Sequence, residues 1–223
     1  MLLLPWALVL LAGYPLRAQQ ASVASTLHNL SVSGPGEIKS KTETEVCKFC
    51  HIPHSAVVPE PLWSHALSQV GQYGVAKIRR GGGTAEPAPQ PDGSSRLCMS
   101  CHDGTVALGD IAREEQALPM EGSQRLNPGQ NGYLGTDLSG SHPISFEVPD
   151  GDQGLRGGAR DMGLRPLSAI RSDGQVRLDK KGKMQCTTCH EPHSDQYYRS
   201  GRVPHFWVKP SVKEVCLTCH ELR

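Results

Sequence analysis

Residues 46–55 read VCKFCHIPHS and residues 185–194 read QCTTCHEPHS. We call these segments the N-terminal repeat and the C-terminal repeat. Both contain the frame Cys-x-x-Cys-His followed by x-Pro-His-Ser. The same frame occurs twice more without that extension, as CMSCH at 98–102 and CLTCH at 216–220. The four frames use all eight cysteines of the 223-residue chain.

Cys-x-x-Cys-His is the attachment signal for c-type haem. Two thiols one helical turn apart form thioethers with the two vinyl groups, and the histidine that follows becomes the proximal iron ligand. We therefore predict four covalently bound haem c groups. The predicted attachment residues are Cys47, Cys50, Cys98, Cys101, Cys186, Cys189, Cys216 and Cys219. The predicted proximal ligands are His51, His102, His190 and His220.

Three other uses of paired cysteines fit less well. A disulfide framework suits an even number of cysteines but does not require a histidine after every pair. Zinc ribbons also use Cys-x-x-Cys pairs without that histidine. A thioredoxin-like motif occurs once within a βαβ unit, whereas this frame occurs four times.

The composition explains why a cofactor is needed. Aromatic residues make up only 5% of the chain, while it contains 24 glycines and 17 prolines. Such a chain buries little apolar area against the conformational entropy that it loses on folding. We therefore predict a multihaem cytochrome c fold that is mostly irregular loop, with short α-helices around the motifs, little β-structure and a core formed by the haems. The chain without haem should not fold.

Residues 1–14 are almost wholly apolar. This segment is as long as the hydrophobic part of a signal peptide and too short to span a membrane. We predict a signal peptide over 1–18, with Ala21 and Ala24 as alternative cleavage points. No Lys or Arg precedes the apolar run, so a buried N-terminal helix is the alternative.

Removing 1–18 deletes one basic residue and leaves equal numbers of basic and acidic residues. This balance gives no support to nucleic acid as a partner. We expect no membrane span in the mature chain.

The repeats divide the chain into two predicted halves. Each repeat is followed by one plainer motif, which indicates an N-terminal dihaem unit over 19–112 and a C-terminal dihaem unit over 140–223. The segment 113–139 between them has few apolar residues and several turn signals, so we predict a linker or loop.

Six histidines remain once the proximal ligands are assigned. They are His28, His54, His65, His142, His193 and His205. Because six exceed the four positions to fill, we predict bis-histidine iron and hence low potentials; Met120, Met162 and Met184 are the alternative ligands, and His/Met ligation raises the potential. Three residues span at most about 10 Å, too little to pass around a porphyrin. His54 therefore cannot be the distal ligand opposite His51, nor His193 opposite His190, and each must serve another haem.

Several further stretches resemble exported multihaem c-type cytochromes with doubled Cys-x-x-Cys-His motifs. They are 28–31 with 34–36, 46–55, 61–63, 97–109, 141–144, 185–194 and 215–220. The resemblance favours His28, His54, His142 and His193 as the distal ligands. It leaves His65 and His205 as packing or surface residues, although their spacing does not exclude them. Trp63, Phe206 and Trp207 are expected to pack on haem faces or edges.

The resemblance implies electron transfer in the periplasm or at the cell surface, with redox partner proteins or other cytochromes. Some similar tetrahaem proteins polymerise into filaments of stacked haems, and His28 could then ligate a haem of the next subunit. A multihaem reductase of a small oxyanion is a further alternative, but it needs an open iron position, and nothing in the sequence marks one. We therefore predict an electron carrier, not an enzyme.

Overall fold

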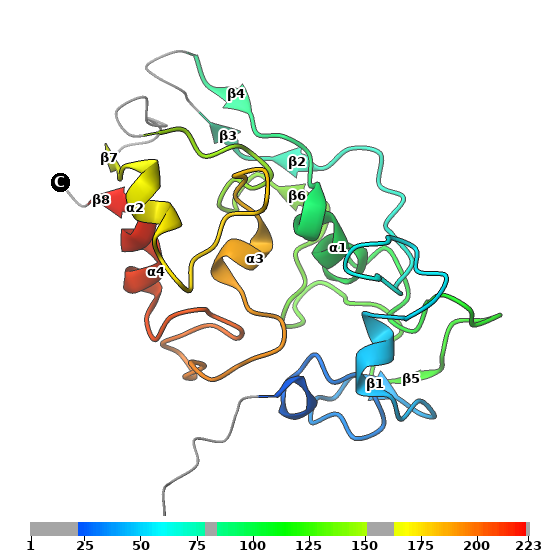
Figure 1. Ribbon diagram of the computed structural model, residues 1–223. Helices are drawn as coiled ribbons and strands as arrows, with labels where there is room; N and C mark the ends of the chain where they lie inside the picture. The colour runs from blue at the N-terminus through cyan, green and yellow to red at the C-terminus, as the bar shows by residue number, and fades with distance from the viewer. Residues whose placement is uncertain (1–21, 79–83, 151–162, 222–223) are drawn as a thin grey trace, which may run out of the picture.

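The computed structural model describes residues 22–78, 84–150 and 163–221; the predicted signal peptide and Met162 lie outside them. Loops make up most of the described chain (Figure 1). The helical segments are η1 (Val23–Ser25), η2 (Val46–Phe49), α1 (Gly93–His102), α2 (Leu167–Arg171), α3 (Cys186–Cys189) and α4 (Val212–Cys219). The strands are β1 (Lys39–Ser40), β2 (Gly74–Val75), β3 (Lys77–Ile78), β4 (Glu86–Pro87), β5 (Met120–Glu121), β6 (Asp137–Leu138), β7 (Gly163–Leu164) and β8 (His220–Glu221).

Each motif begins in a short helical turn. The first motif lies on the 3₁₀-helix η2, and the other three lie on α1, α3 and α4. Local capping explains where α3 and α4 begin. Gln185 and Thr188 form a reciprocal capping box at α3, and the Ser211 hydroxyl accepts from the Glu214 N–H at 3.2 Å at α4. Such turns place both thiols of a motif on one side of the chain.

The motif helices follow one another in space in their sequence order. Figure 1 shows α4, α3 and α1 running from the C-terminal side of the molecule towards its N-terminal side. The cysteines pack accordingly, because Cys50 and Cys101 lie against one apolar cluster and Cys189 and Cys219 lie against another. The four attachment points thus form a continuous row.

The strands are pairs of two residues each. β1 pairs with β5 and β2 with β6, so both ends of the predicted linker 113–139 are hydrogen-bonded to the N-terminal part of the chain. β3 pairs with β4, and β7 pairs with β8 beside the fourth motif. The segment 113–139 is therefore packed on the N-terminal region over much of its length.

The described side chains form several small apolar clusters, which lie beside the motif cysteines. The largest surrounds Phe146, Ile170 and Met184 and reaches Cys189 and Cys219. Met120 lies in the cluster beside Cys50 and Cys101. Both methionines are buried packing residues. Within the described ranges, no helix is long and apolar enough to cross a membrane.

Candidate functional site

None of the eight motif cysteines forms a disulfide, and cysteines of successive motifs lie near one another. The Cys98 and Cys186 thiols hydrogen-bond, which joins the second motif to the third. Burial raises the pKa of Cys50, Cys101 and Cys189 to about 12. These thiols are therefore protonated at neutral pH and lie in apolar surroundings, as attachment points for an apolar ring edge would.

The ring nitrogens of the motif histidines are fixed by backbone carbonyls. His51 Nδ1 donates to the Pro61 carbonyl at 2.7 Å, and His102 Nδ1 donates to the Gly132 carbonyl at 2.6 Å. Because a carbonyl oxygen can only accept, Nδ1 must carry the proton in both rings. Nε2 then keeps a free lone pair, which is the form of imidazole that ligates a metal.

Glycine is required at position 132 for this contact. Its φ is +84°, and a Cβ there would lie 3.1 Å from His102 Cε1. A side chain would therefore crowd the ring that the carbonyl holds. The predicted linker thus contributes directly to the second motif.

Three of the motif histidines face a second histidine ring. The ring centroids are 6.1 Å apart for His51 and His193. The corresponding distances are 6.0 Å for His102 and His28 and 6.3 Å for His220 and His142. Two imidazoles that share one metal through bonds of about 2.0–2.1 Å have centroids roughly 6 Å apart. Each pair therefore has the spacing of two axial ligands on one iron.

The second ring of each pair also has its Nδ1 engaged. His28 Nδ1 donates to the Pro192 carbonyl at 3.0 Å, and His142 Nδ1 donates to that of Pro143 at 2.8 Å. His193 Nδ1 donates to the Glu191 carboxylate at 2.8 Å. The same tautomer follows as for the motif histidines, with Nε2 left free.

Burial keeps the enclosed histidines neutral. Desolvation lowers the pKa of His28 to about 4, although the Pro192 carbonyl acts in the opposite direction. Desolvation also lowers the pKa of His102, His190 and His220. At pH 7 these rings are therefore ready to ligate iron without first losing a proton.

In the part of the chain that the structure describes, neither His54 nor His190 has a ring contact with another histidine. His54 is exposed. The ring that meets His190 is Trp207, edge to face at 4.9 Å. The distal ligand of the third motif is thus the one position that the ring contacts leave unassigned.

The other two histidines are packing residues. Both nitrogens of His65 face carbonyls, with Nδ1 2.8 Å from the Ala66 oxygen and Nε2 3.0 Å from that of Ala107. His65 is 1% exposed, so neither nitrogen is accessible to a metal. His205 stacks on Tyr198 at 3.5 Å and pairs with Asp195.

The three aromatic residues singled out in the sequence all contact histidines of the site. Trp63 lies edge to face with His51, and Trp207 does so with His190. Phe206 stacks on His28 with centroids 4.0 Å apart. Each of the three thus packs against a histidine that the sequence predicts as a haem ligand.

Three buried polar atoms test whether the residues fit a haem. Within the described ranges, Trp63 Nε1, Ser64 Oγ and His220 Nδ1 have no hydrogen-bond partner of normal geometry. Buried donors of this kind normally have one. All three belong to or adjoin residues of the first and fourth motifs, and a group with apolar faces and carboxylate acceptors suits such places. The thiol pairs, the free Nε2 atoms and these orphan donors together fit haem c.

One buried network that the sequence did not reveal joins α1 to α3. The Ser95 hydroxyl donates to Gln185 Oε1 at 2.5 Å and accepts from the Cys186 N–H at 3.0 Å. Gln185 Nε2 donates to Asp92 at 2.9 Å and to Asp179 at 3.0 Å. This network holds the second and third motifs side by side. In the sequence, only the position of Gln185 directly before a motif cysteine pointed to a role for this residue beside the motif.

A family model described as a doubled CXXCH motif matches residues 180–222, which contain the third and fourth motifs. The match supports a c-type cytochrome-like protein and implies covalently bound haem c. No curated protein matches the chain.

Proposed function

We propose that this chain is an exported tetrahaem c-type cytochrome that transfers electrons. One haem would be held at each motif. The axial ligands would be His51 with His193, His102 with His28, and His220 with His142. By elimination His190 would take His54, which makes the two repeats exchange their second histidines.

The observation that carries this proposal is the set of three imidazole pairs about 6 Å apart. Each pair joins one motif histidine to one distal candidate. In five of these six rings Nδ1 is bound to an oxygen, so Nε2 is left for the metal. Packing alone does not require a common tautomer at five separate places.

The chemistry when haem is bound is one-electron exchange at the iron, and the chain sets its conditions. Neutral imidazole on both sides favours low potentials. The row of attachment points brings successive cofactors close together. The Gln185 network fixes the central spacing, between the second and third motifs.

The C-terminal repeat supports the cross-connection of the haems. His190 belongs to the third motif, the Pro192 carbonyl holds His28 opposite His102, and His193 faces His51. Three residues within 190–193 thus supply, face or hold proposed ligands of three different haems. Such a junction suits fast electron exchange among neighbouring cofactors.

The paired histidines also favour an electron carrier over a reductase or a filament subunit. Eight histidines for four haems leave no open iron position of the kind a reductase needs, so we propose a non-enzymatic role. His28 faces His102 of its own chain, which supports a ligand role within one subunit and needs no neighbouring subunit in a filament. We propose a periplasmic or cell-surface location with redox proteins as partners. Ionised haem carboxylates would make the surface acidic and attract basic partners.

The test combines intact mass with spin state. The purified protein should carry four covalent haems, all low-spin, and should bind little carbon monoxide when reduced. His28→Ala should keep four haems and turn one of them high-spin. Fewer than four haems in the wild type, or unchanged spin states in the variant, would contradict the proposal.

A further inference from the structure

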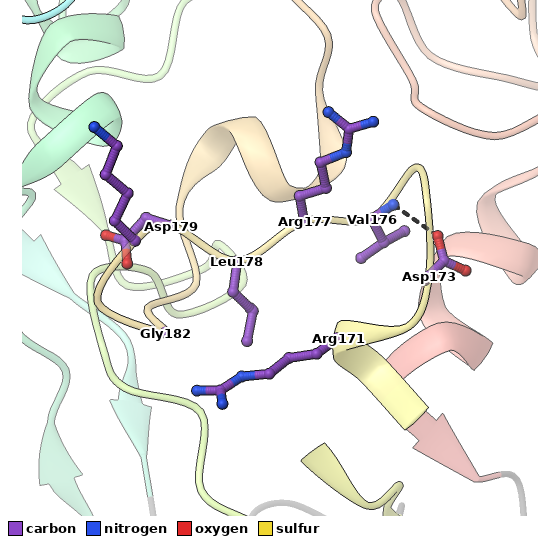
Figure 2. A pocket seen from close by; sticks show the side chains of 8 residues that line it. Arg171, Asp173, Val176, Arg177, Leu178, Asp179 and Gly182 are labelled. Atoms are coloured by element: carbon purple, nitrogen blue, oxygen red, sulfur yellow. Dashed lines mark hydrogen bonds between the residues drawn. The ribbon is translucent and has the colours of Figure 1, made fainter. Parts of the chain in front are cut away.

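A cleft of about 390 Å³ lies between the end of α2 and the loop that leads to α3 (Figure 2). Its volume is within the range of small-molecule and cofactor sites. The lining residues are Arg171, Asp173, Val176, Arg177, Leu178, Asp179, Lys180 and Gly182. None of them belongs to the set of predicted haem ligands.

One wall of the cleft is apolar and continues to the motif cysteines. Val176 is 1% exposed and belongs to a cluster that Cys189 and Cys219 pack against. Leu178 packs on the neighbouring cluster, which the same two cysteines reach. The apolar wall of the cleft therefore lies beside the cysteines to which the third and fourth haems would be attached.

The opposite wall carries a cation without a partner. Arg171 has no hydrogen bond or ion pair within the described ranges, and Figure 2 shows Leu178 pointing towards it while Arg177 extends away. A Cβ on Gly182, where φ is +75°, would lie 3.1 Å from Arg171 Nη2. Glycine at this position thus leaves room for the guanidinium at the edge of the cleft.

The two carboxylates of the lining are already engaged. Asp173 pairs with Lys209 and accepts the N–H groups of Gln175 at 2.9 Å and Val176 at 2.8 Å. Asp179 accepts from Gln185 at 3.0 Å and from the Lys181 N–H at 2.8 Å. Neither acid is bonded to Arg171, so its positive charge remains available to a ligand.

We propose that this cleft holds the carboxylate edge of a haem attached through Cys189 or Cys219, with Arg171 binding a propionate. The inference rests on the proposed function. A porphyrin has its apolar thioether edge opposite its carboxylate edge, and the cleft has an apolar wall near the thiols and a guanidinium across from it. Guanidinium binds carboxylate through two parallel hydrogen bonds, which makes Arg171 suited to this role.

The experiment is a spectroelectrochemical titration of the haem-loaded protein. A cation near a haem favours the reduced state, so Arg171→Ala should shift one of the four midpoint potentials to a more negative value. Arg171→Lys should keep most of the wild-type value. Arg202→Ala is the matched control, because it removes the same side chain from an exposed loop position between α3 and α4 that does not line the cleft.

A second arm distinguishes a haem carboxylate from a free oxyanion in the same cleft. Inorganic phosphate is added to the wild type and to Arg171→Ala in a phosphate-free buffer. If the cleft holds a propionate, the wild-type potentials do not change with phosphate. A phosphate-dependent shift that Arg171→Ala abolishes would identify a free oxyanion and overturn the proposal.

Intact mass distinguishes failure of the Arg171 proposal from failure of the proposed tetrahaem function. Four covalent haems in Arg171→Ala with all four midpoints unchanged would overturn the role of Arg171 and leave the proposed function standing. A wild-type mass without haem would overturn the proposed function itself.

Discussion

The N-terminal and C-terminal repeats are identical at six of their ten positions but have different surroundings. The C-terminal repeat has Gln185 and Glu191 where the N-terminal repeat has Val46 and Ile52, and it is followed by Asp195 in place of Ala56. Each of these polar residues forms hydrogen bonds that its apolar counterpart cannot form. Gln185 bonds to Ser95 and Asp92, Glu191 bonds to His193, and Asp195 accepts from the Phe206 N–H. The shared motif residues therefore provide the same attachment chemistry, while Gln185 and Asp195 bind the C-terminal repeat to other segments of the chain.

The second histidines of the repeats give the largest expected effect. His193→Ala and His54→Ala should each leave four covalent haems and turn one haem high-spin, because each removes one proposed distal ligand. Mass spectrometry and electron paramagnetic resonance measure both properties.

The control for these variants is His205→Ala, which removes a stacked ring outside the proposed ligand set and should leave all haems low-spin. If His54→Ala also leaves four low-spin haems, His54 is not a distal ligand and the two repeats do not exchange their second histidines.

Replacing Gln185 by valine gives the C-terminal repeat the residue of the N-terminal one. The change leaves the buried Ser95 hydroxyl and two carboxylates without their amide partner, so stability should fall by about 1–3 kcal/mol. Chemical unfolding of the haem-loaded protein followed by circular dichroism measures the loss. Thr187→Val, which removes an exposed hydroxyl bond to Ser94, should cost less than about 0.5 kcal/mol. Equal effects of the two changes would mean that the network does not join the motifs.

Asp195→Ala tests the second difference between the repeats. The carboxylate accepts from the Phe206 N–H at 2.7 Å and pairs with His205, so its loss should cost about 1–2 kcal/mol. Thermal unfolding monitored at the haem absorption band measures it. Asp195→Asn keeps an acceptor for the N–H and should recover part of the loss; if it is as destabilising as alanine, the main-chain bond is not the source.

Glu191→Ile should have the smallest effect. The Glu191 and His193 side chains are 49% and 62% exposed, and exposed pairs of this kind contribute about 0–1 kcal/mol. We expect unchanged spin states and a small shift in thermal unfolding. A high-spin haem in this variant would show that Glu191 is needed to orient His193, which would widen the difference between the repeats.

The sequence predicted the groups that carry their own signature. Motif spacing identified the thiols and the histidines beside them. The reach of three residues led us to expect that His193 serves another motif, and its ring lies 6.1 Å from that of His51. The high glycine and proline content indicated a loop-rich chain. Strands of two residues are too short to show a period-2 pattern, so the β-pairs could not be foreseen.

The positioning contacts could not be predicted because they use the backbone. The carbonyls of Pro61, Gly132 and Pro192 hold three of the proposed ligand histidines, and any residue has a carbonyl. The Gln185 network could not be foreseen either, since its partner Ser95 is 90 residues away. Long-range contacts of this kind are decided by the whole fold and not by local spacing.

The contact of His28 with the Pro192 carbonyl joins residues 164 positions apart, and this distance has a consequence for maturation. An exported chain emerges with its N-terminus first, so the first two motifs arrive before residues 192 and 193 do. Under the proposed ligand assignment, His193 can reach the first motif only after the C-terminal repeat has followed, and until then His28 lacks the carbonyl that orients it towards His102. The time taken to translocate the second half of the chain would then set how long the first motif waits for its distal ligand.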